Sequence, residues 1–280
     1  LVGRNNVGKT AILEALHMFS GKDELCNEYV RKTLAELHGN RPSSLVYGYS
    51  GKAKIMYKLN WKGFRAPPTE KVGEVSEEVE EEVEFRDLVI EVTEKGLIYA
   101  YYLPVQSELR GKVRYQIAPA VVRAGFEEAV SDLSSRLGRF PTFYIPNHSN
   151  AYGLLRDYVL GEDVWSSIVK NGLHVRVVRD LLAPTIYDDV TEVFVERGRL
   201  SLRKVVGDSV LYVDIDSLGE GVRRALLVYL AAGHLKPRVL LWDDIETAVH
   251  LSLLESVIRW LTGSDMQVVV TTHSLDVLWE

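Results

Sequence analysis

The sequence lacks three features, each of which would have indicated a class of protein. It contains one cysteine, Cys26, so a framework of disulfide bonds is excluded and a cytoplasmic setting is expected. No run approaches the roughly 18 apolar residues of a membrane span, so no membrane partner is expected. No secretory segment is visible either, and the sequon Asn147-His148-Ser149 is therefore interpreted as incidental.

An excess of basic charge is also missing. The formal net charge is −6, and the segment 77–84 alone holds six glutamates. Subtracting those six from the 39 acidic residues leaves 33, which balances the 33 basic residues. The overall charge therefore does not indicate a nucleic-acid partner. We interpret the glutamate run as a solvated hairpin or loose loop, and a docking site for a basic partner is the alternative.

The chain has 280 residues, of which 46% are hydrophobic, enough for a sizeable core. There is no initiator methionine, and only Leu1 and Val2 precede the first motif. Residues 275–280 begin a helical pattern that the sequence does not complete. We therefore expect this chain to be a segment of a longer protein.

The first motif is a phosphate-binding loop, G-x-x-x-x-G-K-[ST]. Its residues are Gly3, Arg4, Asn5, Asn6, Val7, Gly8, Lys9 and Thr10, and with Ala11 they form the predicted nucleotide-binding set. The glycines let the backbone approach an anion closely. Lys9 is placed to reach the β- and γ-phosphates, and the Thr10 hydroxyl can ligate Mg²⁺. Residues 11–19 read as an amphipathic helix whose N-terminus faces the phosphates. The motif predicts that the chain binds a nucleoside triphosphate.

The middle of the chain mixes strands with helices. Period-2 patterns at 53–59, 88–92 and 97–102 predict an antiparallel β meander. Helix or loop is predicted for 21–41, helices for 126–137, 152–171 and 175–182, and an extended apolar stretch for 141–146.

In the last third of the chain, three strands at 190–195, 200–206 and 210–215 are separated by Arg197-Gly198 and Gly207-Asp208 turns. A helix from 218 to about 232, a buried strand at 239–242, a helix at 249–261 and a strand at 267–271 follow. Strand–helix alternation of this kind predicts an α/β fold with a mostly parallel sheet covered by helices.

Two carboxylates, Asp243 and Asp244, end the apolar strand 239–242. The C-terminal end of a buried strand is where ligands bind in α/β folds. Asp243 is the predicted Mg²⁺ ligand, and Asp244 stands where a carboxylate could orient the attacking water. The structural alternative is a pair of acids that cap the next helix.

A second glycine-rich segment opens the helix at 218–232. Its sequence is Ser217-Leu218-Gly219-Glu220-Gly221. Ser-x-x-Glu before a helix is a capping box, which is the structural interpretation. A capping box does not need two glycines in the first turn, where each costs up to about 1 kcal/mol. The functional interpretation is a second phosphate cradle made by Ser217, Gly219 and Gly221, which would meet the γ-phosphate bound by a partner subunit.

His273 follows the last predicted strand, in the run Thr271-Thr272-His273-Ser274. An imidazole at a strand's C-terminal end can touch a γ-phosphate and sense its loss, whereas the alternative is an ordinary loop histidine.

Together the four motifs resemble the ABC-type ATPase heads of the SMC, RecF and OLD group, and most closely the AAA-15/AAA-21-type ATPases of prokaryotes. Asn5 is similar to the asparagine of the SMC-like G-x-N-x-x-G-K loop, and the segment 217–221 to their signature motif. Residues 243–250 look like the run that joins Walker B to the D-loop, and His273 like the switch histidine. The likeness is specific at residues 1–20 and 210–280 and loose between them.

The resemblance implies a P-loop NTPase fold, here an ABC-ATPase-like head with a mostly parallel sheet, an antiparallel β meander and an inserted helical lobe. The predicted divisions are a nucleotide-binding core at 1–60 and 190–280, the meander with its acidic loop at 61–125 and the helical lobe at 126–189. It also implies ATP and Mg²⁺ as ligands and an ATP-sandwiched homodimer, in which Lys9, Thr10, Asp243 and His273 would face Ser217 and Gly219 of the partner.

The sequence departs from the family pattern in two places. Asp244 stands where a glutamate is usual and is one methylene shorter, which predicts slow turnover or a longer contact. The glutamine of the family's Q-loop has no clear match, and Gln106 is the candidate. No N-K-x-D guanine-reading motif is present, which favours ATP over GTP.

Three functions remain open at this stage. The first is an Mg²⁺-dependent ATPase switch in which Lys9, Asp244 and His273 are catalytic and which acts on DNA or a partner effector protein. The second is an ATP-gated dimerisation clamp with little turnover. The third is the ATPase part of a defence or repair nuclease whose TOPRIM domain lies elsewhere. The candidate DNA contacts are Arg110-Lys112-Arg114, Arg197-Arg199-Arg203-Lys204 and Arg223-Arg224. Each such run is more often a solvated strand or helix face than a phosphate-binding track.

Overall fold

The computed structural model describes residues 8–17, 51–58, 71–72, 85–93, 98–104, 114–118, 142–185 and 189–274. The predictions made for 21–41, 77–84 and 126–137 lie outside these residues. The chain divides into two compact units, residues 1–33 with 139–280 and residues 34–138. The finer divisions predicted from the sequence stay predictions. In the described part of the chain, no helix is long and apolar enough to cross a membrane.

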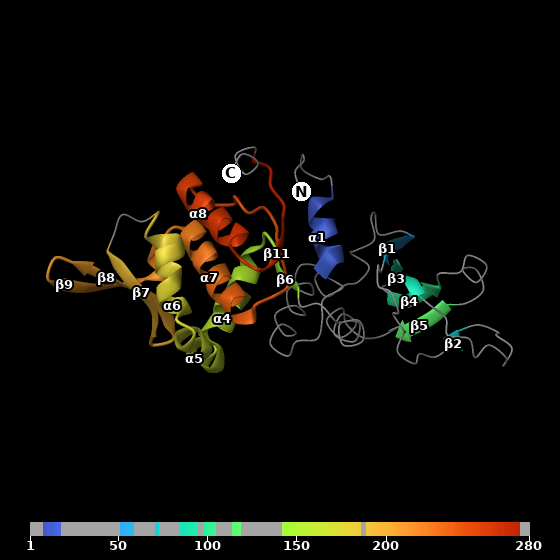
Figure 1. Cartoon of the computed structure of the whole chain (residues 1–280), viewed down its shortest axis with the longest axis horizontal. Helices are drawn as coiled ribbons and strands as arrows, with labels where there is room; N and C mark the ends of the chain where they lie inside the picture. Colours follow the sequence, from blue (N-terminus) through green and yellow to red (C-terminus); the bar gives the residue numbers. More distant parts are fainter. Residues whose placement is uncertain are drawn as a thin grey trace. The chain divides into compact units, whose positions relative to one another are not determined.

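A three-stranded parallel sheet forms the centre of the first unit (Figure 1). Its strands are β6 (Thr142–Ile145), β10 (Val239–Trp242) and β11 (Gln267–Val270), in the order β11-β10-β6. Trp242 pairs with Ile145 on one side and with Val270 on the other. The carboxyl ends of the three strands therefore lie at one edge of the sheet, where polar residues that follow each strand can meet.

Successive side chains of β6 and β10 point to opposite faces of this sheet, and they therefore pack into two different layers. Phe143, Ile145, Leu240 and Trp242 belong to the main core, whereas Tyr144, also fully buried, packs against His17 of the helix α1 (Lys9–His17). Figure 1 shows α1 on one side of the sheet and α4, α7 and α8 on the other. The predicted α/β arrangement with a parallel sheet is confirmed.

Helical segments follow β6, β9 and β10 in the described part of the chain. They are α4 (Ser149–Leu160), α5 (Glu162–Lys170), α6 (Leu173–Val177), the π-helical turn η3 (Val178–Leu182), α7 (Glu220–Leu235) and α8 (Leu251–Thr262). Every residue from Ala225 to Ala232 is buried, so α7 is the central helix of the core. A helix that is buried on all sides must be apolar all round, as this stretch is.

The single helix predicted for 152–171 is wrong, because the chain forms two helices that meet at Gly161. Gly161 has φ −56° and ψ 133°, an extended conformation that ends α4 and begins α5. The predicted start of the later helix at Leu218 also shifts, since α7 begins at Glu220 after a short 3-10 turn, η4 (Ile215–Ser217).

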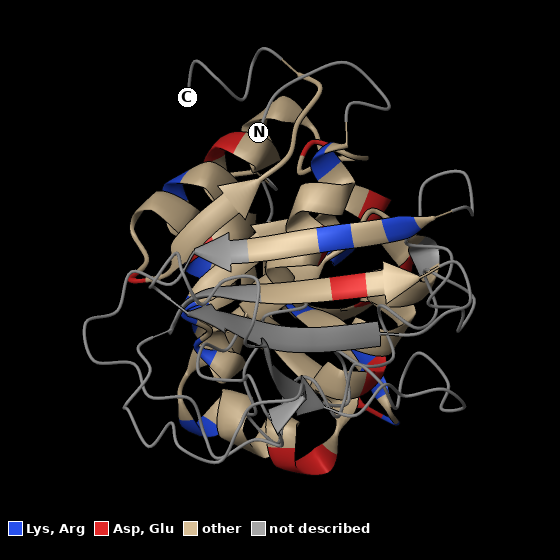
Figure 2. Ribbon diagram, turned by 90° about the vertical axis from the view of Figure 1, so that its right-hand side faces the viewer, with Lys and Arg blue, Asp and Glu red and all other residues tan. Residues whose placement is uncertain are grey.

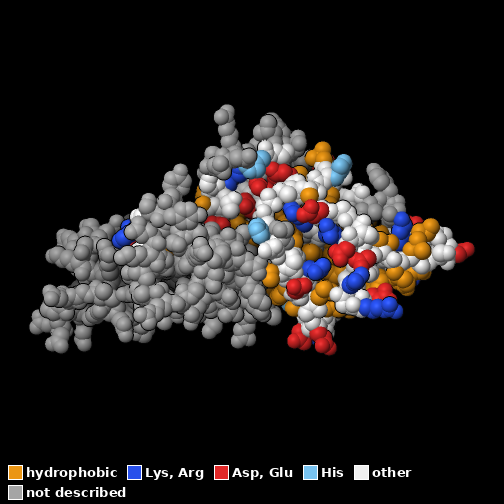
Figure 3. All heavy atoms as spheres, turned by 180° about the vertical axis from the view of Figure 1, so that it is seen from behind, with side chains coloured by type: hydrophobic (Ala, Val, Ile, Leu, Met, Phe, Trp, Pro, Cys, Tyr) orange, Lys and Arg blue, Asp and Glu red, His pale blue; other side chains and the backbone are white. Residues whose placement is uncertain are grey.

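Two antiparallel sheets complete the described structure. One contains the strands β7 (Val190–Glu196), β8 (Arg199–Val206) and β9 (Ser209–Asp214), joined by the two predicted turns. Arg197, Gly198 and Gly207 have positive φ, as tight hairpin turns require. Hydrophobic side chains gather over these hairpins (Figure 3) and include Val206, Val210, Leu211 and Tyr212.

The other antiparallel sheet lies in the second unit and has the order β1-β3-β4-β5-β2. Its strands are β1 (Lys52–Lys58), β2 (Lys71–Val72), β3 (Phe85–Thr93), β4 (Ile98–Pro104) and β5 (Arg114–Ala118). The predicted meander is confirmed in β1, β3 and β4. Lys52 and Lys54 of β1 each lie 3.8 Å from the carboxylate of Glu91 on β3, and Figure 2 shows these opposite charges on neighbouring strands.

Candidate functional site

Asp243 follows β10 and extends the sheet by donating its backbone N–H to the carbonyl of Ile145. The residue is 5% exposed. Its two carboxylate oxygens accept hydrogen bonds from different elements: Oδ2 from the Thr10 hydroxyl at 2.7 Å and Oδ1 from the Thr271 hydroxyl at 2.5 Å. Burial raises the pKa of Asp243, the two hydroxyl groups oppose that rise, and the charge of Asp244 adds to it. A cation held at this carboxylate would reverse the shift.

Lys9 is the first residue of α1, directly after Gly8, whose φ of +82° is in the left-handed region. The side chain is mostly covered, with the residue 7% exposed. Its Nζ atom lies 3.0 Å from Nδ1 and 3.1 Å from Nε2 of His273. The ammonium and the first N–H groups of α1 thus concentrate positive charge at one point, which suits an anion.

Asp244 stands beside Asp243 with φ +48°, a left-handed conformation that is unusual for a residue with a Cβ. Its backbone N–H donates to the Thr271 hydroxyl at 2.7 Å. Its carboxylate lies 3.2 Å from His273 Nε2 through Oδ1, and Oδ2 accepts from Asn147 Nδ2 at 3.1 Å. The imidazole of His273 therefore lies between the Lys9 ammonium and the Asp244 carboxylate.

Glu246 fixes the segment that carries His273. Its Oε1 atom accepts from the backbone N–H of His273 at 2.6 Å and from that of Ser274 at 3.2 Å. The turn at 245–248 is further joined to the end of β11, since the Ile245 N–H donates to the carbonyl of Thr271. The strand ends of β10 and β11 are therefore connected by both side-chain and backbone hydrogen bonds.

The second glycine-rich segment is built differently from the predicted capping box. The Ser217 hydroxyl donates to the carbonyl of Asp214 at 2.6 Å, and Gly219 occupies the N-cap position with no side-chain cap. A Cβ on Gly221 would lie 2.1 Å from the carbonyl oxygen of Ala248, whereas one on Gly219 would meet nothing within 4 Å. Gly221 is thus required by close packing inside the chain, and Gly219 leaves open space at the start of α7.

The structure brings together five of the predicted site residues: Lys9, Thr10, Asp243, Asp244 and His273. Ala11 is exposed in the first turn of α1. Residues 3–7 of the phosphate-binding loop and Gln106 lie outside the described residues. Ser217, Gly219 and Gly221 lie in the turn that leads into α7, and the cradle predicted for them stays a prediction.

Two side chains were not singled out from the sequence. Thr271 bonds to both Asp243 and Asp244, and Asn147 contacts Asp244 from the end of β6. The sequence carried a signal for each, because both are polar residues that follow an apolar strand. In the sequence, Asn147 is noticeable only as part of a sequon that we interpret as incidental.

The residues present fit a magnesium ion together with a nucleotide. The Thr10 hydroxyl and the Asp243 carboxylate place two oxygen ligands 2.7 Å apart at the N-terminus of α1. Oxygen ligands are those that Mg²⁺ prefers, and it is usually bound by one or two protein groups plus phosphates and water. The described residues contain no cluster of three or more His, Cys, Asp or Glu that could hold a metal without such help.

This fold and this arrangement of strand ends are those that the resemblance to ATPase heads predicts. The profile of the family described as "AAA domain, putative AbiEii toxin, Type IV TA system", AAA_21, matches residues 1–278, so the chain belongs to this family. The resemblance stated from the motifs is thereby confirmed. No curated protein matches the chain.

Two solved structures are similar over nearly the whole chain. One is an SMC head bound to the C-winged helix domain of ScpA, with a TM-score of 0.52 and 14% identity, covering 99% of this chain and 83% of that one. The other is an Smc head domain with an extended coiled coil, bound to the C-terminal domain of ScpA derived from Pyrococcus furiosus. Its TM-score is 0.46 and its identity 12%, and the match covers 99% and 84% of the two chains. At this identity the first likeness supports the fold alone.

Proposed function

We propose that the chain is an Mg²⁺-dependent ATPase that closes on ATP together with a second copy of itself. The observation that carries the proposal is the convergence of Lys9, Thr10, Asp243 and His273, which come from three separate elements and are joined by hydrogen bonds of 2.7–3.1 Å. Chance matches to short motifs would not bring these four side chains to one edge of a sheet. Membership of the AAA-domain family supports the same reaction.

Each side chain has a role that its position allows. Lys9 exchanges its contact with His273 for the β- and γ-phosphate oxygens, and Thr10 with Asp243 would hold the metal ion. Bound Mg²⁺ supplies charge neutralisation and polarisation of the phosphate oxygens. Asp244 accepts a proton from, or orients, the attacking water. His273 lies between Lys9 and Asp244 and so is placed to respond to the presence of a γ-phosphate.

Two features of the described part of the chain support the proposed homodimer. Ser217 is exposed, and Gly219 presents open space at the N-terminus of α7, which has 16 residues and hence an aligned dipole. We propose that this segment contacts the γ-phosphate bound by the other subunit. A contact made only in the closed state lets ATP binding close the dimer and hydrolysis open it.

Mixing two inactive variants tests the ATPase and the shared site in one experiment. Lys9→Ala damages the phosphate-binding side, and Ser217→Arg blocks the exposed glycine-rich side. If the sites are shared, a mixed dimer contains one intact site, so a 1:1 mixture should regain about a quarter of wild-type phosphate release.

The matched control mixes Lys9→Ala with Asp243→Asn, which damage the same side and should regain nothing. If the wild type is active but neither mixture regains phosphate release, the shared site is contradicted. Wild-type protein that releases no phosphate would contradict the ATPase itself.

An ATP-gated clamp with little turnover is the second candidate. It is favoured by one observation: both carboxylate oxygens of Asp244 are already engaged, by His273 and Asn147. The variant Asp244→Glu adds the methylene that the family usually has. A large gain in phosphate release would support the clamp, and unchanged turnover would count against it.

A partner protein is the client that we propose for the switch. Several basic side chains considered for DNA lie near carboxylates: Arg199 is 3.5 Å from Asp214, Arg203 is 4.0 Å from Glu192 and Arg223 is 3.4 Å from Asp216. On the face drawn in Figure 3, basic and acidic side chains are interspersed over the described residues. DNA affinity measured against salt concentration, with and without ATP, checks this; a steep ATP-dependent salt slope would favour DNA instead.

A further inference from the structure

Asn147 lies at the end of β6 between two groups of opposite charge. Its Nδ2 atom donates to Asp244 Oδ2 at 3.1 Å, and its Oδ1 atom accepts from Arg224 Nη1 at 3.4 Å. The two ends of an amide are chemically opposite, one a donor and the other an acceptor. A flipped amide would set its oxygen against the carboxylate and its NH₂ against the guanidinium. The two neighbours therefore fix the orientation of Asn147.

Arg224 is itself held in place by its surroundings. It lies in the second turn of α7, is 8% exposed, pairs with Glu220 and stacks over the ring of Tyr152 at 4.4 Å from the ring centroid. Burial raises the pKa of Tyr152 to about 12, although Arg224 acts in the opposite direction, so the ring stays a neutral phenol. A cation over a neutral aromatic face is a favourable contact.

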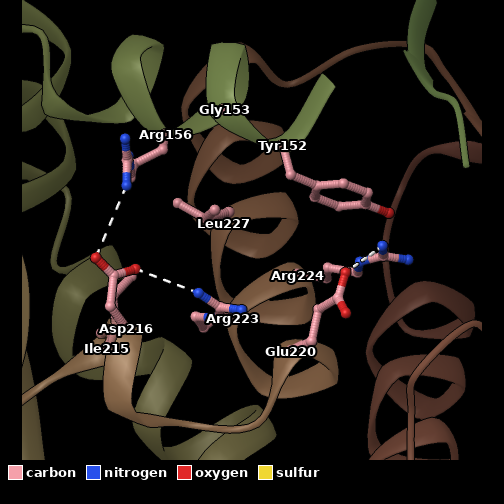
Figure 4. Close-up of a pocket in the computed structure, with 9 residues that line it drawn as sticks. All are labelled: Tyr152, Gly153, Arg156, Ile215, Asp216, Glu220, Arg223, Arg224 and Leu227. Carbon is pink, nitrogen blue, oxygen red and sulfur yellow. Dashed lines mark hydrogen bonds and ion pairs between the residues drawn. The ribbon is translucent and has the colours of Figure 1, made fainter. Parts of the chain in front are cut away.

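The same helix carries a second arginine that serves as an internal comparison. Arg223 points to the other side of a pocket of about 250 Å³, where it and Arg156 converge on Asp216 (Figure 4). Arg224, drawn beside Glu220 and Tyr152, lies at the opposite side of this pocket. Two neighbouring arginines thus have different partners, and only Arg224 is hydrogen-bonded to Asn147 among the contacts described.

We propose that Asn147 is a positioning residue for the reaction, holding the Asp244 carboxylate in place, and that Arg224 ties this support to helix α7. The inference rests on the proposed ATPase function and deepens it. Asp244 has a left-handed backbone, a sparsely populated conformation that persists where surrounding contacts hold it. Three successive contacts connect helix α7 with the carboxylate at the end of β10. They join Glu220 to Arg224, Arg224 to Asn147, and Asn147 to Asp244.

Kinetics of ATP hydrolysis test the positioning role. Asn147→Ala should lower kcat about tenfold and leave KM for ATP within about twofold, because Asn147 supports a group that acts only in the chemical step. Arg224→Gln should lower kcat in the same way, and the double variant should show little further loss, since the two residues act as one unit. Arg223→Gln, one position away on the same helix, is the matched control and should keep wild-type kcat.

A spectroscopic readout tests the contact without turnover. In nucleotide-free protein labelled with ¹⁵N at asparagine, the side-chain NH₂ signal of Asn147 is the one absent from Asn147→Ala. We expect this signal to move in Asp244→Ala and in Arg224→Gln and to stay in place in Arg223→Gln. An Asn147→Ala variant with wild-type kcat, or an amide signal that ignores Asp244→Ala, would overturn the inference. Absence of turnover in the wild type would instead overturn the proposed function, and the kinetic role of Asn147 with it.

Discussion

Two regions of the molecule differ in how much of a site each contains. One is formed by the strand ends of β10 and β11, and the other is the glycine-rich segment that leads into α7. At the strand ends, side chains separated by up to 264 positions in the sequence meet within hydrogen-bond distance. At the glycine-rich segment, the Ser217 hydroxyl is satisfied by its own turn, and Gly219 faces open space. The first region is organised by contacts within the chain, whereas the second offers a surface that nothing in the described structure fills. This difference is the physical basis for proposing that the second region serves another subunit.

Lys9→Ala has the largest expected effect and would disable the first region directly. The ammonium is placed to stabilise charge that develops on the transferred phosphoryl group, so its loss should lower turnover about a thousandfold. Phosphate release at saturating ATP measures it. Lys170→Ala, which removes an exposed lysine at the end of α5, is the control and should leave turnover unchanged. Full activity of Lys9→Ala would remove the basis for the site.

Asp243→Asn should lower turnover about a hundredfold and raise the Mg²⁺ concentration needed for half-maximal rate, because a neutral amide is a poorer magnesium ligand. Hydrolysis measured across a Mg²⁺ titration checks this. The control is Asp265→Asn, which makes the same chemical change at an exposed aspartate just before β11, away from the strand ends. An unchanged Mg²⁺ dependence in Asp243→Asn would place the metal elsewhere.

Within the glycine-rich segment, a closely packed glycine can be compared with one that faces open space. The two variants are Gly221→Ala and Gly219→Ala. The added Cβ at Gly221 would overlap the Ala248 carbonyl, so we expect a loss of about 2 kcal/mol in the free energy of unfolding. Gly219→Ala meets nothing within 4 Å and should stay within about 0.5 kcal/mol of wild type in stability. Urea denaturation of both variants measures the difference. Equal stabilities would contradict the close packing of α7 on the turn at 245–248.

The smallest expected effect concerns His17, which is buried under the sheet and bonds to the Thr142 hydroxyl at 2.9 Å. Burial lowers the pKa of His17 from 6.5 to about 3, so the folded state binds this proton less readily than the unfolded state. The stability that the neutral ring contributes is complete above pH 6.5 and is lost as the pH falls toward 3.

At pH 5.5 the loss should be about 1 kcal/mol. His17→Gln keeps a polar group for Thr142 and removes the titration. The difference in unfolding free energy between pH 7.5 and 5.5 should therefore shrink in this variant. The same pH dependence in wild type and variant would show that His17 does not cause it.

Much of the site could be predicted because its residues lie at the ends of apolar strands or in a glycine-containing loop, both of which leave a local pattern. Asp243 after β10 and His273 after β11 are of this kind, and β10, β11 and α1 form close to where the periodicity placed them. The local pattern also defined the β7–β9 hairpins, since glycine-containing turns separate their strands.

What could not be predicted depends on contacts between distant residues. The break at Gly161 arises from the extended backbone of that one residue, which the helical pattern on either side does not show. The bond from Ser217 to Asp214 replaces the capping box because the chain enters α7 through a 3-10 turn. Asn147 and Arg224 acquire their roles only when β6 and α7 are folded together, 77 positions apart in sequence.

The most direct test of the account is calorimetric titration of a non-hydrolysable ATP analogue into wild-type protein, with Mg²⁺ and then with Mg²⁺ removed by chelation. If Lys9, Thr10 and Asp243 form one site for a magnesium-bound nucleotide, binding in Mg²⁺ should be saturable and at least about tenfold tighter than in its absence. Binding that is absent, or equally tight with and without Mg²⁺, would contradict the central claim.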